Sequence, residues 1–91
     1  MARIKWFETQ GIAIYIYAEL FGKHHNPHVL VRRTTVESTQ YGFDGNPIKG
    51  CKKLKRPQDH KLVSCWILSK KEKLEEAWNM INKGIDPGML D

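Results

Sequence analysis

The chain has 91 residues, of which 41% are apolar and 27% are charged, and its formal net charge is +5. This composition is typical of a soluble globular domain and argues against a disordered chain. A domain of this length leaves little room for a deep enclosed cavity. No apolar run approaches the roughly 20 residues of a membrane-spanning helix, and the run at 12–18 is too short for a signal peptide. We therefore expect a single domain over residues 1–91, a cytoplasmic location and no membrane partner.

Strand signals dominate the first half of the chain. Apolar and polar residues alternate imperfectly over residues 3–8 and most clearly from Gly11 to Glu19, which predicts the first two strands. Residues 28–33 and Val36 to Phe43 follow as a third and a fourth strand. Residues 20–27 have the composition of a loop, and Ile48 would close a short final strand after the Asp-Gly-Asn-Pro turn. The sequence thus predicts about four strands in a row.

The second strand has two chemically different faces. Ile12, Ile14 and Ile16 fall on one face, and Tyr15 and Tyr17 fall on the other, because side chains alternate along a strand. We expect the isoleucine face to be core and the tyrosine face to be half-buried or in contact with a partner.

The second half of the chain follows a helical period. Pro57 is suited to a helix N-terminus, and Gly84 follows as a C-cap. Ser69 and Glu72 have the spacing of a capping box, so we expect one helix over 57–82 that is bent or split near Ser69. Its apolar stripe is formed by Leu62, Val63, Trp66, Ile67, Leu74, Ala77, Trp78 and Ile81.

These elements predict an α+β domain. Its mainly antiparallel sheet of about four strands would be covered on the isoleucine face by the C-terminal helix, kinked or split. Trp66 and Trp78 should then be substantially buried, and residues 84–91 would form a loose tail. Cys65 lies within the helical pattern and is expected to be a small core residue, and with Cys51 alone it gives no disulfide framework.

The positive charge is concentrated in one segment. Residues 41–61 carry six lysines and arginines and two aspartates, which is +4 of the net +5. Such a cluster attracts phosphate chains through counterion release. A solvated loop that only keeps the domain soluble is the alternative. The cluster consists of Lys49, Lys52, Lys53, Lys55, Arg56 and Lys61.

Three stretches of the sequence resemble a known family. They are Gly11-Ile12-Ala13-Ile14-Tyr15-Ile16-Tyr17, then His24-His25-Asn26-Pro27-His28-Val29-Leu30-Val31, and then Trp66, Leu74 and Trp78. They are similar to the G-I-x-I-x-x-Y strand, the H-x-P-P-H-x-H-V segment and the W-x7-L-x3-W helix of domain of unknown function family 4160. Here Asn26 stands where that family has the first of two prolines, and Leu30 where it has a third histidine.

The resemblance implies a biological context rather than a reaction. Members of this family are small bacterial proteins, and their genes often lie beside small regulator-like genes of toxin–antitoxin type. The family has no established activity, so the chemistry must be argued from the residues of this chain.

The histidines allow a metal-dependent and an enzymatic interpretation. His24 and His28 have a ligand-compatible spacing, but Pro27 breaks the helical geometry that would place them on one face, so we rank a metal site lowest. A metal-independent ribonuclease would need a base, an acid and a cation. His28, Arg32 and Glu37 are the candidates, with His28 and Arg32 on one face of a simply alternating third strand.

We rank a non-catalytic binding module first. It would contact nucleic acid, RNA or DNA, or a small cognate protein, without a cofactor, and a homodimer is a further possibility. Tyrosines on a sheet can stack bases, and basic residues bind phosphates. The expected contact residues are Tyr15, Tyr17, Arg32, Lys52, Lys53, Lys55 and Arg56.

Overall fold

The computed structural model of the chain describes residues 2–18, 27–34 and 36–90. Four strands, β1 (Ala2–Phe7), β2 (Ile12–Ile16), β3 (His28–Arg33) and β4 (Glu37–Gly42), form an antiparallel sheet in the order β1-β2-β3-β4. The predicted four-stranded sheet is confirmed. The predicted loop over 20–27 lies, except for Pro27, outside the described residues.

A glycine forms the turn of the first hairpin, between β1 and β2. Gly11 adopts a φ of 67°, which a glycine tolerates without strain, and its N–H donates to Phe7 O at 2.9 Å. The register then shifts between Arg3 and Lys5, a bulge in β1. Ile4, at this bulge, is fully buried, so the irregularity keeps an apolar side chain in the core.

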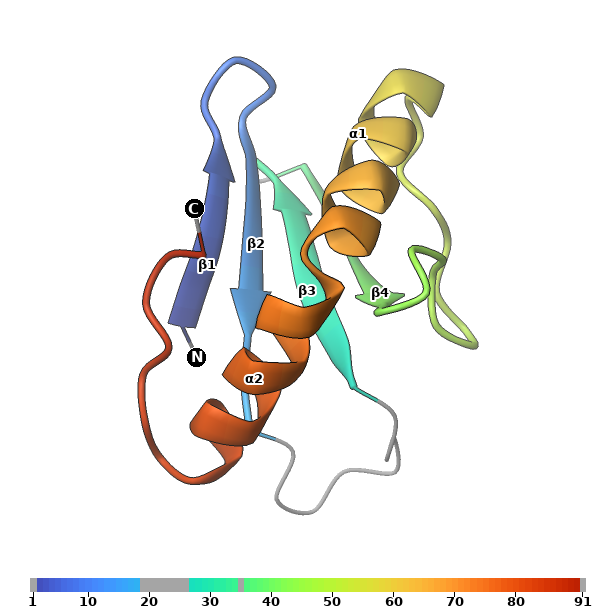
Figure 1. The fold of residues 1–91 in the computed structure, drawn as a ribbon. Coiled ribbons are helices and arrows are strands. Elements are labelled where there is room, and N and C mark those ends of the chain that lie inside the picture. Colours follow the sequence, from blue (N-terminus) through green and yellow to red (C-terminus); the bar gives the residue numbers. More distant parts are fainter. Residues whose placement is uncertain (1, 19–26, 35, 91) are drawn as a thin grey trace.

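Two helices cover one face of the sheet (Figure 1). They are α1 (Pro57–Ser69) and α2 (Lys71–Asn82), so the predicted helical segment is split where we expected. The cause differs from the predicted capping box: the Ser69 hydroxyl donates to Trp66 O at 2.8 Å, and neither helix has a side-chain N-cap bond. A hydroxyl that bonds back to a carbonyl in this way bends a helix.

The core lies between the helices and the isoleucine face. Ile12, Ile14 and Ile16 are fully buried, as predicted. Trp66 is 8% exposed and Trp78 packs half-buried against the same cluster. Cys65 is exposed, which corrects the prediction that it belongs to the core, because it lies beside the buried stripe of α1 rather than on it.

The end of the chain returns to the first strand. Gly84 has a φ of 79°, and the Ile85 N–H donates to Met80 O at 2.9 Å, which is a glycine C-cap as predicted. The Leu90 N–H donates to Ile4 O at 2.9 Å, and Leu90 packs against the core. The C-terminal segment therefore lies beside β1 (Figure 1). In the part of the chain that the structure describes, no helix is both long and apolar enough to cross a bilayer.

Candidate nucleic-acid interface

The face of the sheet that points away from α1 and α2 has its own regular pattern. Strand pairing aligns its side chains in two cross-strand rows. One row is Trp6, Ala13, Arg32 and Ser38, and the next is Arg3, Tyr15, Leu30 and Gln40. We call these eight residues the helix-free face. It contains two arginines, two aromatic rings and no carboxylate.

Each arginine of the helix-free face lies against an aromatic ring. The Arg3 Cζ atom is 5.8 Å from the centroid of Trp6, and the Arg32 Cζ atom is 5.8 Å from that of Tyr15. These are cation–π distances. Trp6 is 40% exposed, both arginines are exposed and Tyr15 is half-buried. Cationic and aromatic surface is therefore available to a ligand without any rearrangement of the core.

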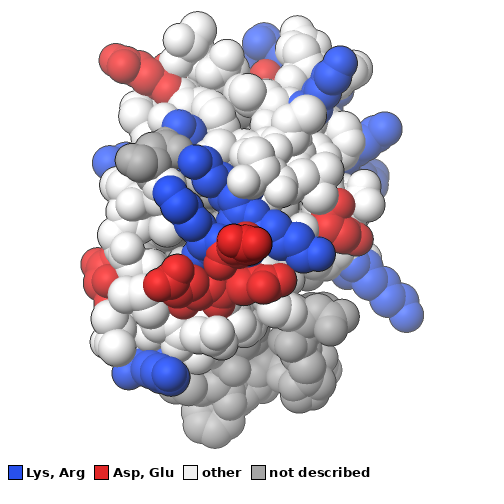
Figure 2. Space-filling model, in the orientation of Figure 1, with Lys and Arg blue, Asp and Glu red and all other residues white. Residues whose placement is uncertain are grey.

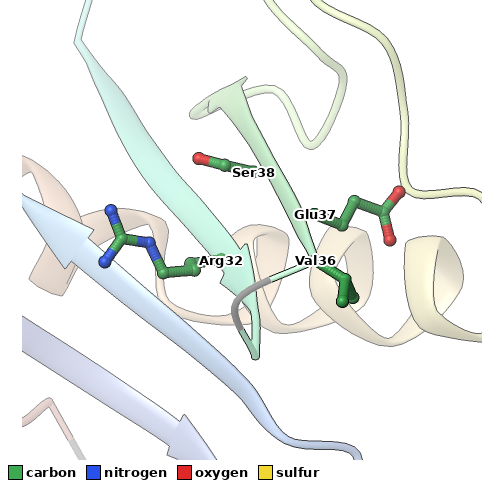
Figure 3. Close-up of a pocket in the computed structure, with 4 residues that line it drawn as sticks. All are labelled: Arg32, Val36, Glu37 and Ser38. Carbon is green, nitrogen blue, oxygen red and sulfur yellow. The ribbon is translucent and has the colours of Figure 1, made fainter.

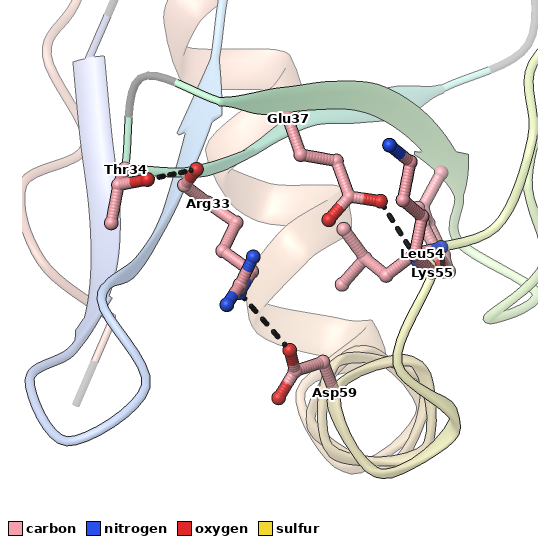
Figure 4. A network of polar contacts seen from close by, with 7 residues as sticks. Arg33, Thr34, Glu37, Leu54, Lys55 and Asp59 are labelled. Atoms are coloured by element: carbon pink, nitrogen blue, oxygen red, sulfur yellow. Dashed lines mark hydrogen bonds and ion pairs between the residues drawn. The ribbon is translucent and has the colours of Figure 1, made fainter.

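The residues between β4 and α1 form a second cationic surface. We call residues 49–56 the basic loop; Lys52, Lys53, Lys55 and Arg56 are all exposed. The backbone of this loop is fixed to the edge of β4. The Thr39 hydroxyl donates to Lys52 O. The Lys55 N–H donates to Glu37 Oε2 at 2.8 Å (Figure 4). The charged side chains are thus displayed from an anchored backbone.

Two adjacent hollows connect the helix-free face with the basic loop. The first, of about 370 Å³, is lined by Arg32, Val36, Glu37 and Ser38. Arg32 and Ser38 project to one side of their strands and Glu37 to the other (Figure 3). The second hollow, of about 490 Å³, shares Val36, Glu37 and Ser38 and extends to the loop. Its remaining lining residues are Thr39, Gly50, Cys51, Lys52, Lys53 and Lys55.

Arg33 does not join this surface, although it follows Arg32 directly. Its Nε atom lies 3.3 Å from Asp59 Oδ2, and the two side chains are 21% and 5% exposed (Figure 4). The pair connects β3 to the first turn of α1, where a carboxylate also interacts favourably with the helix dipole. Arg33 is therefore a structural cation, while Arg32 lies on the side of the sheet away from the helices.

A buried tyrosine connects β4 with α1 behind the basic loop. The Tyr41 hydroxyl accepts the Leu54 N–H at 3.0 Å and forms a 2.7 Å hydrogen bond with His60 Nδ1. Burial raises the pKa of Tyr41, the Leu54 hydrogen bond lowers it, and the nearby Glu37 charge raises it further; burial is the largest effect. The hydroxyl holds the end of the basic loop in place.

The side chains of the two predicted tyrosines, Tyr15 and Tyr17, make different contacts. Tyr15 lies on the helix-free face, but Tyr17 follows the end of β2, and its hydroxyl lies 3.2 Å from His28 Nε2. His28 is 1% exposed, and its ring centroid lies 5.5 Å from that of Trp78 in α2. The structure therefore buries the His28 ring beside Trp78, whereas the Arg32 side chain, four residues further along β3, is exposed.

The candidate catalytic and metal residues are also dispersed. His28 pairs with Gly42 at one end of β4, whereas Glu37 lies at the other end, opposite Arg33. His24 lies outside the described residues. Among the residues that the structure describes, no three histidine, cysteine or acidic side chains are grouped so that they could hold a metal ion.

Sequence reasoning missed two members of the surface. Arg3 and Trp6 lie on β1, where the alternation is irregular because of the bulge, and their position on the helix-free face follows only from the pairing with β2. The cross-strand register, rather than any motif, reveals them.

Comparison with known proteins identifies the family of the chain. No curated protein and no solved structure matches it. A protein-family profile, described as a domain of unknown function (DUF4160), matches residues 11–79, which span β2 to most of α2 and include Tyr15, Arg32 and the whole basic loop. The chain therefore belongs to the DUF4160 family.

Proposed function

We propose that this protein is a non-catalytic nucleic-acid-binding module, which acts within a small bacterial regulatory gene pair of toxin–antitoxin type. Its ligand would lie across the helix-free face and the basic loop. The gene context comes from the family resemblance alone, while the binding surface is argued from the geometry described above.

The adjacency of the two hollows is the observation that carries this proposal. Val36, Glu37 and Ser38 line both of them, with Arg32 at the first hollow and the loop lysines at the second. A polyanion that crosses both hollows meets cations from two separate elements. Exposed lysines and arginines along one path are typical of surfaces that bind a phosphate backbone.

One feature of the helix-free face favours nucleic acid over an acidic protein partner. The helix-free face offers aromatic rings with adjacent guanidinium groups, and such a combination suits bases as well as phosphates. By contrast, the helix-covered side carries positive and negative side chains next to each other (Figure 2). In α2 alone, Lys71 and Lys73 alternate with Glu72 and are followed by Glu75 and Glu76.

The ribonuclease alternative lacks such support. His28, its proposed acid or base, is 1% exposed and is packed between Tyr17 and Trp78. General acid–base catalysis requires the side chain within hydrogen-bond reach of the reacting group. A phosphodiester on the helix-free face would not reach this ring.

The salt dependence of binding tests the proposal. Affinity for a short oligo(U) RNA should fall as salt rises. Lys52→Gln with Lys53→Gln should reduce the slope of log affinity against log salt by about 0.7 to 1 for each phosphate that is no longer neutralised. A matched double variant, Lys71→Gln with Lys73→Gln, removes the same charge from exposed positions of α2. It should leave the slope close to that of the unmodified protein.

Three results of the nucleic-acid binding measurements would contradict the proposal. They are an absence of binding to any nucleic acid at low salt, equal slopes for the two double variants, and unchanged binding when Lys52, Lys53, Lys55 and Arg56 are all replaced by glutamine. Capture of an acidic protein by the same loop, without nucleic-acid binding, would also overturn it. The oligonucleotide should be recovered intact after incubation in EDTA, and cleavage under these conditions would revive the ribonuclease.

A further inference from the structure

We infer that the helix-free face binds single-stranded nucleic acid in preference to a duplex, with Trp6 and Tyr15 as two base-stacking positions. This inference rests on the proposed function and specifies its substrate class. Trp6 is its main new element, because the sequence alone does not distinguish this residue from a core tryptophan.

The register places the two rings as diagonal neighbours. Trp6 is opposite Ala13, and Tyr15 lies two residues further along the same strand, on the same face. Diagonal neighbours on adjacent antiparallel strands are about 7–8 Å apart, which is within reach of aromatic side chains. Two successive bases of an extended strand could therefore each meet one ring.

The surface between the rings is closed underneath. Ala13, which lies between the larger residues Trp6 and Arg32 in its row, is only 4% exposed. A base is therefore expected to lie on top of a ring rather than to enter a pocket. Stacking on an open platform accepts every base, because each has a π-face.

Each proposed stacking position also contains a guanidinium group beside its ring. Arg3 lies against Trp6 and Arg32 against Tyr15, both at 5.8 Å from the ring centroid. Each group can therefore contact the phosphate or the plane of a base that is stacked on its ring. With no carboxylate among the eight residues, nothing on the face repels the backbone.

This arrangement discriminates against a duplex. The bases of a double helix are stacked on one another and present only their edges in the grooves, whereas unpaired bases can turn toward an aromatic side chain. Phosphate contacts from the basic loop would be available to both forms. The preference for a single strand should therefore come from the rings and not from the lysines.

The test compares the rings with matched substitutions. Affinity would be measured by fluorescence anisotropy for labelled oligo(U), and for the duplex of oligo(U) with oligo(A), at several salt concentrations. Trp6→Leu should weaken oligo(U) binding by about tenfold or more, without changing the salt slope, because one base no longer stacks. Trp6→Phe should retain most of the affinity, and Tyr15→Leu and Tyr15→Phe should differ in the same way.

Leu68→Ala provides the control for removal of an exposed apolar side chain. Leu68 lies on α1 and is 54% exposed, so its replacement should leave affinity unchanged. Thermal unfolding of Trp6→Leu tests whether the variant is folded. If it is unfolded, the comparison of Trp6→Phe with Tyr15→Leu and the duplex measurement still test base stacking. Equal affinity for duplex and single strand would overturn the inference.

The inference and the proposed function can fail separately. If the lysine variants lower the salt slope while neither leucine variant weakens binding, the stacking positions are wrong and the binding module stands. If the unmodified protein binds neither form of nucleic acid, both are wrong. Equally weakened binding in the leucine and phenylalanine variants would show that the rings act only through packing, which also contradicts stacking.

Discussion

At the scale of single residues, Tyr41 shows how one hydroxyl secures the candidate interface. It is fully buried, accepts the Leu54 N–H and is bonded to His60 on α1. Because Leu54 lies within the basic loop, this hydroxyl connects the loop to both β4 and α1. Its position was not predicted: the sequence indicates a strand through Tyr41, but it does not indicate which helical residue the ring meets.

The raised pKa of Tyr41 makes a prediction about alkaline pH. A phenol whose pKa is higher in the folded state than its ordinary value of 10.0 stabilises the fold at lower pH, and this contribution is lost as the pH rises through the folded-state pKa. The free energy of unfolding should therefore decrease above about pH 10. Tyr41→Phe should show a shallower decrease there.

At neutral pH, Tyr41→Phe should lower the free energy of unfolding by about 1–3 kcal/mol, because the buried Leu54 N–H loses its acceptor. Denaturant unfolding at a series of pH values measures both effects. Tyr15→Phe removes one hydroxyl from the helix-free face and should match the unmodified protein at neutral pH. An alkaline profile that is the same for Tyr41→Phe and the unmodified protein would contradict this assignment.

At the scale of elements, hydrophobic periodicity predicted the secondary structure. It predicted the strands to within two or three residues and the buried isoleucine face of β2, because burial of one face selects the period of a strand or a helix. The prediction that Cys65 belongs to the core was wrong. Cys65 is one residue away from Trp66, and one step along a helix turns the side chain by about 100°, here away from the core. The break at Ser69 was right in position and wrong in cause.

Trp66 tests how α1 is fixed to the sheet. Its ring meets Phe7 edge-on with a centroid distance of 6.3 Å, and its indole N–H has no hydrogen-bond partner among the described residues. Trp66→Ala should lower the free energy of unfolding by about 3 kcal/mol or more, because a large cavity remains. Trp66→Phe should cost much less, since the N–H that it removes was unpaired. Chemical denaturation of both variants measures this, and an alanine variant within about 1 kcal/mol of the unmodified protein would be inconsistent with a core position.

At the scale of the whole molecule, the candidate interface depends on register and on tertiary contacts that no local pattern encodes. Lys52, Lys53 and Lys55 were expected from charge alone, but their connection to Arg32 follows from the attachment of the loop to the edge of β4. Tyr17 follows the last residue of β2, and its hydroxyl lies 3.2 Å from His28 Nε2, a contact that the alternation of β2 alone does not predict.

The three tryptophans of the chain allow the central claim to be tested in one spectrum. Trp6 lies on the helix-free face, whereas Trp66 and Trp78 belong to the helices. In a nitrogen–proton correlation spectrum, with the Trp6 indole signal assigned from Trp6→Phe, addition of oligo(U) should shift that signal and leave the other two in place. Movement of the Trp66 or Trp78 signal with an unchanged Trp6 signal would contradict binding on the helix-free face.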